Sequence, residues 1–517
     1  MPDAPSPVRP NILWITSDQQ HWTLLGCQNP EVSTPNLDRL AARGMLFERA
    51  YTPNPTCTPT RASLITGRFP SQHGAWSLGT KLDEGIPTVG EIFQESGYDA
   101  TLIGKAHFQQ LFGTEEFPSL ESYPILRDLK FWSGFEGPFY GFNHVELARN
   151  HTDESHVGQH YALWMEEKGL KNWRDHFQNK LGDLDFTEGG PVNPPQIGAW
   201  TLPEEFHYNT WITERSCARI DKCLAEEQPF FLWASYFDPH PSYLVPEPWA
   251  SMYDPAKLTV PDVVPGEHDT NPEHFRKSQE EKPDFSNWQE IGGHGLHGCH
   301  SHRTTHEERA RALATYYGMM SCLDHYIGKL LDHLDATGAA ENTLVVFTTD
   351  HGHLFGQHGL QAKGPFLYED LIRVPMIAAW PEHIPAGVRS RALQSLVDLP
   401  VTSLAIAGLK KHPWMTGIDE TAVWTGQTPA LRDSVIVEHH HQPTTIHIRT
   451  YVDARYKITV YFKSDEGELF DLQEDPGELR NLWKDPAAKE LKSTLLLRLI
   501  QAELGREPLP MPRVSGA

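Results

Sequence analysis

Cysteine is scarce in this chain and never occurs in a close pair. The six cysteines stand at positions 27, 57, 217, 223, 299 and 322 without any C-x-x-C spacing. The sequence therefore indicates neither a disulfide framework nor a structural zinc site. A cysteine in a reducing compartment is usually a small buried hydrophobe. We expect this of five of the six, and Cys57 is the exception.

Long apolar runs are also missing. The run Ile12–Ile15 is far shorter than the ~20 residues that span a bilayer. The N-terminal segment has no basic region followed by the apolar stretch of about 7–15 residues that a signal peptide needs. We therefore expect a cytoplasmic protein that does not insert into membranes.

Positive charge is the third deficit, with 44 Lys and Arg residues against 68 Asp and Glu residues and a formal net charge of -24. Such a surface repels phosphate backbones and anionic lipid headgroups, so it argues against nucleic-acid and membrane-surface partners.

The 517 residues suit one large domain with a smaller one. Short β-rich runs alternate with helical patterns, which predicts an α/β fold with a mostly parallel central sheet and helices on both faces. The expected strands are Asn11–Thr16, Ala100–Ile103, Phe230–Tyr236, Leu344–Thr348 and Pro375–Ala379, and the expected helices are Thr34–Gly44, Thr88–Gly97, Arg309–Thr337 and Leu396–Ala407. In such folds the loops after the carboxyl ends of the strands carry the chemistry.

The composition also predicts where the chain divides. Residues 1–430 are expected to form the catalytic α/β domain, with loop-rich insertions at about 108–207 and 240–308. The second insertion contains the histidine-rich run HGLHGCHSHRTTH, for which a solvated loop is a better interpretation than a metal site. Residues 431–517 predict a small C-terminal subdomain with an antiparallel sheet, a last helix and a tail. The tail suits an arm that grips a second subunit, which makes a homo-oligomer a candidate assembly.

Two of the expected strands end in an acidic residue. Asp18 and Gln19 follow the first strand, and Asp350 and His351 follow Leu344–Thr348. A single Asp in this position is often a helix N-cap. Two strand ends that each deliver a carboxylate beside an amide or imidazole indicate a site for a hard divalent cation.

The segment around Cys57 adds a candidate nucleophile. Cys57 opens a probable helix, with Arg61 one turn along and Gly67-Arg68 at its end. Free N–H groups and the helix dipole favour an anion at this end. Taken alone, the pattern is also consistent with a thiolate nucleophile.

This block and several others resemble the type I sulfatases of the alkaline phosphatase superfamily. Cys57-Thr58-Pro59-Thr60-Arg61 is similar to their C-x-P-x-R signature, in which the cysteine is oxidised to formylglycine, although Thr60 stands where Ser is commoner. Further similar elements, in order, are Asn11–Gln19, Thr34–Ala41, Gly104-Lys105-Ala106-His107, Asp238-Pro239-His240-Pro241, Thr349-Asp350-His351-Gly352, Gln357-His358-Gly359-Leu360 with Lys363, Arg373-Val374-Pro375 and Glu468-Leu469-Phe470-Asp471-Leu472.

The resemblance implies a metal site and a modified residue. Asp18, Gln19, Asp350 and His351 would hold one divalent cation together with the formylglycine derived from Cys57. Gln19 and His351 replace the Asp and Asn found in many sulfatases, which lowers the charge of the ligand set. Calcium is the first expectation, with manganese and magnesium as alternatives.

The resemblance also implies roles for the remaining residues. Arg61, Lys105 and Lys363 would surround the sulfate group. His240, beside Lys363, would act as general acid, and His107 as the base that releases sulfate from the sulfated formylglycine hydrate. The implied partners are a small-molecule sulfate ester and, during maturation, a formylglycine-generating enzyme.

Two alternatives remain open from the sequence. Related phosphonate monoester and phosphodiester hydrolases use the same modified cysteine, and Gln19 with His351 suits them as well. The second alternative is an inactive metal-binding homologue in which Cys57 is never oxidised.

Overall fold

A computed structural model describes residues 9–149, 152–178, 197–281, 283–290, 304–441 and 444–516. Within those ranges every helix is too short or too polar to cross a bilayer. The histidine-rich run up to residue 303 and Cys299 lie outside the described residues.

A nine-stranded sheet forms the centre of the large domain. Its order is β12-β2-β11-β8-β1-β6-β3-β4, with β13 also paired to β2. Every pairing is parallel except those that β11 makes with β2 and β8. The strands are β1 (Asn11–Ser17), β2 (Met45–Tyr51), β3 (Asp99–Gly104), β4 (His144–Leu147), β6 (Phe230–Ser235), β8 (Thr343–Thr349), β11 (Arg373–Ala379), β12 (Val388–Ser390) and β13 (Gln394–Ser395).

Alternate residues of each central strand supply two separate cores. Leu13 and Ile15 of β1 pack in one hydrophobic cluster, and Ile12 and Trp14 pack in the other. All four side chains are fully buried. This double burial explains why the strands read as continuous apolar runs rather than as alternating patterns.

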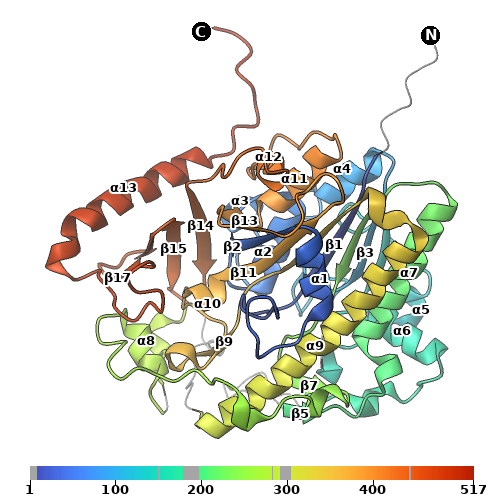
Figure 1. Cartoon of the computed structure of the whole chain (residues 1–517), viewed down its shortest axis with the longest axis horizontal. Helices are drawn as coiled ribbons and strands as arrows, with labels where there is room; N and C mark the ends of the chain where they lie inside the picture. The colour runs from blue at the N-terminus through green and yellow to red at the C-terminus, as the bar shows by residue number, and fades with distance from the viewer. Residues whose placement is uncertain are drawn as a thin grey trace.

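Helices cover both faces of the sheet, as the sequence predicted. The first face packs against α1 (Pro35–Arg43), α6 (Gln159–Glu167), α7 (Tyr208–Ala225) and the long α9 (His306–Thr337). In Figure 1, α1 and α9 lie in front of the strands. The second face packs against α2 (Cys57–Thr66), α4 (Val89–Glu95), α11 (Asp398–Ile406) and α12 (Thr421–Trp424).

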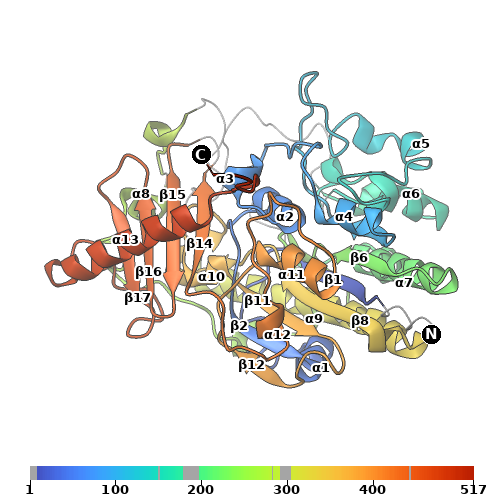
Figure 2. The same cartoon turned by 90° about the horizontal axis from the view of Figure 1, so that it is seen from above.

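A separate antiparallel sheet lies beside this domain (Figure 2). It consists of β14 (Ser434–His440), β15 (His447–Asp453), β16 (Tyr456–Tyr461) and β17 (Gly467–Asp471), with α13 (Lys489–Gly505) packed on one face. The other face shares a core with the large domain, in which Val437 and Ile448 meet Tyr51 and Ile372. The fold class is therefore confirmed, while a domain boundary at residue 430 stays a prediction.

The first insertion contributes more regular structure than its loop-rich composition suggests. Besides α6, it supplies β4, which is the edge strand of the central sheet beside β3, together with the short elements α5 (Leu129–Trp132) and β5 (Ile197–Ala199). The aromatic residues Trp132, Phe139 and Phe142 are buried in the second core. Core packing therefore accounts for them better than a substrate pocket does.

One prediction about cysteine was wrong. Cys27 is exposed, because it lies in a turn where its backbone N–H donates to Asp38 Oδ1 (2.9 Å). Cys223 and Cys322 are buried, and Cys217 is half-buried.

Candidate active site

The two acidic strand ends lie side by side. β1 and β8 are parallel neighbours, and Ser17 is paired with Thr349, so the next residues, Asp18 and Asp350, leave the sheet at the same edge. Gln19 lies at a positive φ of 57° and donates its backbone N–H to Asp350 Oδ1 at 3.0 Å. Both carboxylates are fully buried. The fold thus converts two distant sequence motifs into one cluster.

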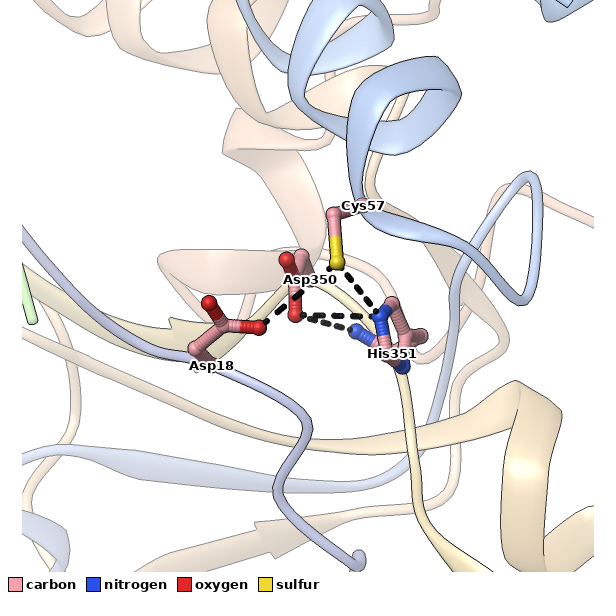
Figure 3. Close-up of side chains that lie close together, drawn as sticks. All are labelled: Asp18, Cys57, Asp350 and His351. Atoms are coloured by element: carbon pink, nitrogen blue, oxygen red, sulfur yellow. Dashed lines mark hydrogen bonds and ion pairs between the residues drawn. The ribbon is translucent and has the colours of Figure 1, made fainter. Parts of the chain in front are cut away.

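Cys57 completes this cluster from the start of α2. Its Sγ lies 3.8 Å from Asp18 Oδ1 and 3.2 Å from His351 Nε2. Figure 3 shows Asp18, Cys57, Asp350 and His351 converging from the ends of β1 and β8 and from the first residue of α2. Their ligand atoms lie within 4.8 Å of one another, and all four residues are buried.

Three cationic side chains surround the cluster. Arg61 Nε donates to Asp350 Oδ2 at 2.9 Å, and its Nη2 lies 3.7 Å from Asp18 Oδ2. Lys105 donates to the same Oδ2 atom of Asp18. Lys363 Nζ lies 3.0 Å from Cys57 Sγ. The bottom of the site therefore combines two carboxylates with three positive charges, all removed from solvent.

Each expected acid–base histidine lies in this surrounding. His240 Nε2 is 3.4 Å from Lys363 Nζ, and its Nδ1 contacts the carbonyl oxygen of Pro241. His107 is half-buried, with a φ of 58°. Burial, together with the positive charges of Arg149 and Lys105, holds the pKa of His107 well below its usual range. Its imidazole is therefore neutral near pH 7 and is suited to accept a proton.

The positive charges also act on the nucleophile position. Burial alone would raise the pKa of the Cys57 thiol, but Lys105 and Lys363 lower it below the ordinary value. Burial likewise opposes ionisation of Asp18, yet Lys105 and His240 keep its pKa low. A developing anion at position 57 is thus electrostatically favoured.

The residues present fit a bound cation. Gln19 Oε1 is buried and has no hydrogen-bond partner, whereas its Nε2 lies 2.6 Å from His353 Nδ1. A buried carbonyl oxygen without a partner is costly, and a metal ion would satisfy it. With Asp18 and Asp350 as the anionic donors, the set of oxygen and nitrogen atoms suits a divalent ion.

Sequence reasoning missed the residues that support the site from behind. Ser235, the last residue of β6, accepts a hydrogen bond from Arg61 Nη1 at 2.8 Å. His353 holds the amide of Gln19, and Glu121 holds the backbone of His107. For His353, proximity to the Asp350-His351 motif was a signal; for Glu121 and Ser235 no local pattern marked a role.

The fold and the site define a class of protein. Two strand-end carboxylates, a nucleophile position at a buried helix N-terminus and a group of cations lie at the same edge of an α/β sheet. They are the parts of an ester hydrolase whose acidic cluster could hold a metal ion.

The comparisons with known proteins identify the family. The family model described as Sulfatase matches residues 10–409, and one described as N-sulphoglucosamine sulphohydrolase, C-terminal, matches residues 356–504. The chain belongs to the sulfatase family and is a sulfuric ester hydrolase.

Three similar proteins illustrate how far the likeness extends. The uncharacterized sulfatase YidJ of Escherichia coli is 27% identical, over 94% of this chain and 86% of its own length. An arylsulfatase of Clostridium perfringens is also 27% identical, over 97% of this chain and 95% of its own length. The structure of the phosphonate monoester hydrolase SpPMH from Silicibacter pomeroyi matches with a TM-score of 0.77 at 23% identity, over 97% and 96% of the two chains. At that identity the last match shows a common fold.

Proposed function

We propose that this chain is a formylglycine-dependent sulfatase that uses one divalent cation to hydrolyse a small organic sulfate ester with an aryl, alkyl or sugar alcohol. The observation that carries this proposal is the position of Cys57 Sγ, 3.2 Å from His351 Nε2 and 3.0 Å from Lys363 Nζ, beside Asp18. Membership of the sulfatase family supports it.

The sulfur atom of Cys57 stands where the hydroxyl groups of a hydrated aldehyde would lie after oxidation. One hydroxyl of that hydrate would attack the sulfur atom of the substrate's sulfate group and displace the alcohol. Loss of the proton from the second hydroxyl would then restore the aldehyde as sulfate leaves. His240 donates a proton to the departing alcohol, with Lys363 beside it. His107 accepts the proton in the release step. Arg61 and Lys105 stabilise negative charge on the transferred group.

Asp18, Gln19, Asp350 and His351, with the modified residue 57, would hold the cation. Bound there, a divalent ion polarises the ester oxygen and favours ionisation of the attacking hydroxyl. We propose calcium, because Asp18, Asp350 and Gln19 offer oxygen donors. The neutral donors Gln19 and His351 lower the charge of the ligand set, so manganese and magnesium are the alternatives.

Conversion of Cys57 requires a cysteine-oxidising enzyme that reads Cys57, Pro59 and Arg61. All three residues are buried within α2 in the folded chain. We therefore propose that this formylglycine-generating partner acts before the chain has folded.

A second candidate is a phosphonate monoester or phosphodiester hydrolase with the same nucleophile. The observation in its favour is the ligand set, in which Gln19 and His351 accompany only two carboxylates.

The deciding experiment compares two substrates with one leaving group, on protein produced together with the oxidising enzyme. One substrate is an aryl sulfate and the other an aryl phosphonate monoester, so the ratio of kcat/KM values reports the preference for the transferred group. Faster sulfate hydrolysis supports the first proposal, and faster phosphonate hydrolysis supports the second.

Mass spectrometry of the Cys57 peptide completes the test. An unmodified thiol, metal-dependent stabilisation and no turnover of either ester would show an inactive metal-binding homologue.

A further inference from the structure

The carboxylate of Glu121 accepts hydrogen bonds from three successive backbone N–H groups. His107 N donates to Oε1 at 2.8 Å, and Phe108 N and Gln109 N donate to Oε2 at 2.9 and 2.8 Å. Glu121 is 1% exposed. Both oxygens of one buried side chain are thus committed to the segment that carries His107.

The backbone of this segment bends at His107, which adopts an unfavourable conformation. His107 has a φ of 58°, in the left-handed region that residues with a Cβ rarely adopt. Successive N–H groups that converge in such a bend form a concave site for an anion. Glu121 supplies that anion, so its charge offsets the backbone strain.

Arg149 closes the arrangement on the other side. Its Nη1 lies 3.2 Å from Glu121 Oε1 and donates to the carbonyl oxygen of Gln109 at 3.0 Å. The guanidinium is almost fully buried. Glu121 and Arg149 both belong to the first insertion, whereas His107 lies three residues after Gly104, the last residue of β3.

The imidazole held in this way belongs to a residue that stands two positions after Lys105, one of the cations around the cluster. His107 Nδ1 is buried without a hydrogen-bond partner. The charges that act on the ring include Lys105, Arg61 and Lys363, which are the cations around Cys57. Within the described residues this nitrogen has no hydrogen-bond partner, and the part of residue 107 that Glu121 holds is its backbone N–H.

We propose that Glu121 is the positioning residue for His107: its carboxylate fixes the strained backbone bend from which the imidazole extends. The inference rests on the proposed function, in which His107 accepts the proton of the release step. It gives the first insertion a role in turnover.

The test is a double-mutant cycle on the formylglycine-containing enzyme with an aryl sulfate. Glu121→Gln keeps the shape of the side chain but turns one acceptor oxygen into a donor that faces N–H groups or Arg149. We expect kcat to fall at least about tenfold while KM changes less than about threefold. In a His107→Ala background, the same substitution should change kcat by less than about twofold, because its effect passes through the missing ring.

A control variant and a second readout keep the outcomes separate. Glu146→Gln removes another carboxylate of the same insertion, paired with Arg215 at 2.7 Å, and should leave kcat unchanged. Amide hydrogen exchange at residues 107–109 should accelerate in Glu121→Gln and stay unchanged in Glu146→Gln. Additive losses of kcat in the cycle, or unchanged exchange at these amides, would overturn the proposal. If the wild-type enzyme does not hydrolyse sulfate, the proposed function fails, and the exchange experiment alone decides whether Glu121 holds the bend.

Discussion

Replacement of His353 by Phe should weaken metal binding, although His353 is not in the ligand set. Gln19 Nε2 lies 2.6 Å from His353 Nδ1, and His353 Nε2 lies 2.7 Å from the Tyr243 hydroxyl. His353 and Gln19 are buried. Because the ring accepts from the amide nitrogen, the amide carbonyl oxygen is left for the cation.

The magnitude follows from the groups that lose their partners. Phe keeps a ring of similar size but bonds neither the Gln19 amide nor the Tyr243 hydroxyl, and each unsatisfied buried group costs about 1–3 kcal/mol. Gln19 is then free to turn its oxygen away from the cation. Loss of a residue that orients a ligand typically lowers metal affinity about 10–100-fold, and we expect a loss of this size.

The assay is calorimetric titration of metal-free protein with calcium and then with manganese. His353→Gln is the matched control, because its side-chain oxygen can still accept from the Gln19 amide and should retain most of the affinity. Thermal melts without metal separate a change in affinity from a change in fold. An affinity within about twofold of the wild type in His353→Phe would refute the reasoning, since the variant removes the proposed orienting bond entirely.

Three further predictions concern the nucleophile, the fold and pH. Cys57→Ser should lower kcat for an aryl sulfate at least ~100-fold, because a serine sulfate has no second hydroxyl to expel the product; comparable turnover would contradict the formylglycine assignment. Gly104→Ala should lower the Tm by several degrees, because the added Cβ would lie 2.0 Å from the Ser235 carbonyl oxygen and Gly104 has a φ of +108°. The control Gly505→Ala should leave the Tm unchanged, because a Cβ there would have no atom within 4 Å. Burial raises the pKa of Glu420 to about 7, so its ionisation destabilises the folded state as pH rises above the unfolded-state pKa of ~4.3 and through 7. Glu420→Gln should therefore melt higher than the wild type at about pH 8, with the advantage vanishing near pH 4; an advantage that does not depend on pH would contradict this cause.

Much of the central sheet could be predicted from local patterns. Strands such as β1 and β8 are buried on both faces, so their apolar runs are continuous, and each ends in an acidic motif. β2 escaped prediction because Glu48 and Arg49 interrupt it. Most of their partners are distant in the sequence: Glu48 pairs with Arg389, and Arg49 donates to the carbonyl oxygens of Asp453 and Ala454 as well as to the nearby Tyr51 hydroxyl.

The sequence by itself determined which residue types are available for chemistry and where each follows its strand or opens its helix, because these relations are local. Asp18, Cys57 and Asp350 were recognisable in this way. Only the tertiary structure decided that the three meet within one buried cluster. It also decided that Glu121, which carries no local signature, fixes the backbone of His107, and that His353 fixes the amide of Gln19. A hydrogen bond between distant segments depends on where those segments pack in the fold, and the local periodicity of the sequence does not indicate their packing.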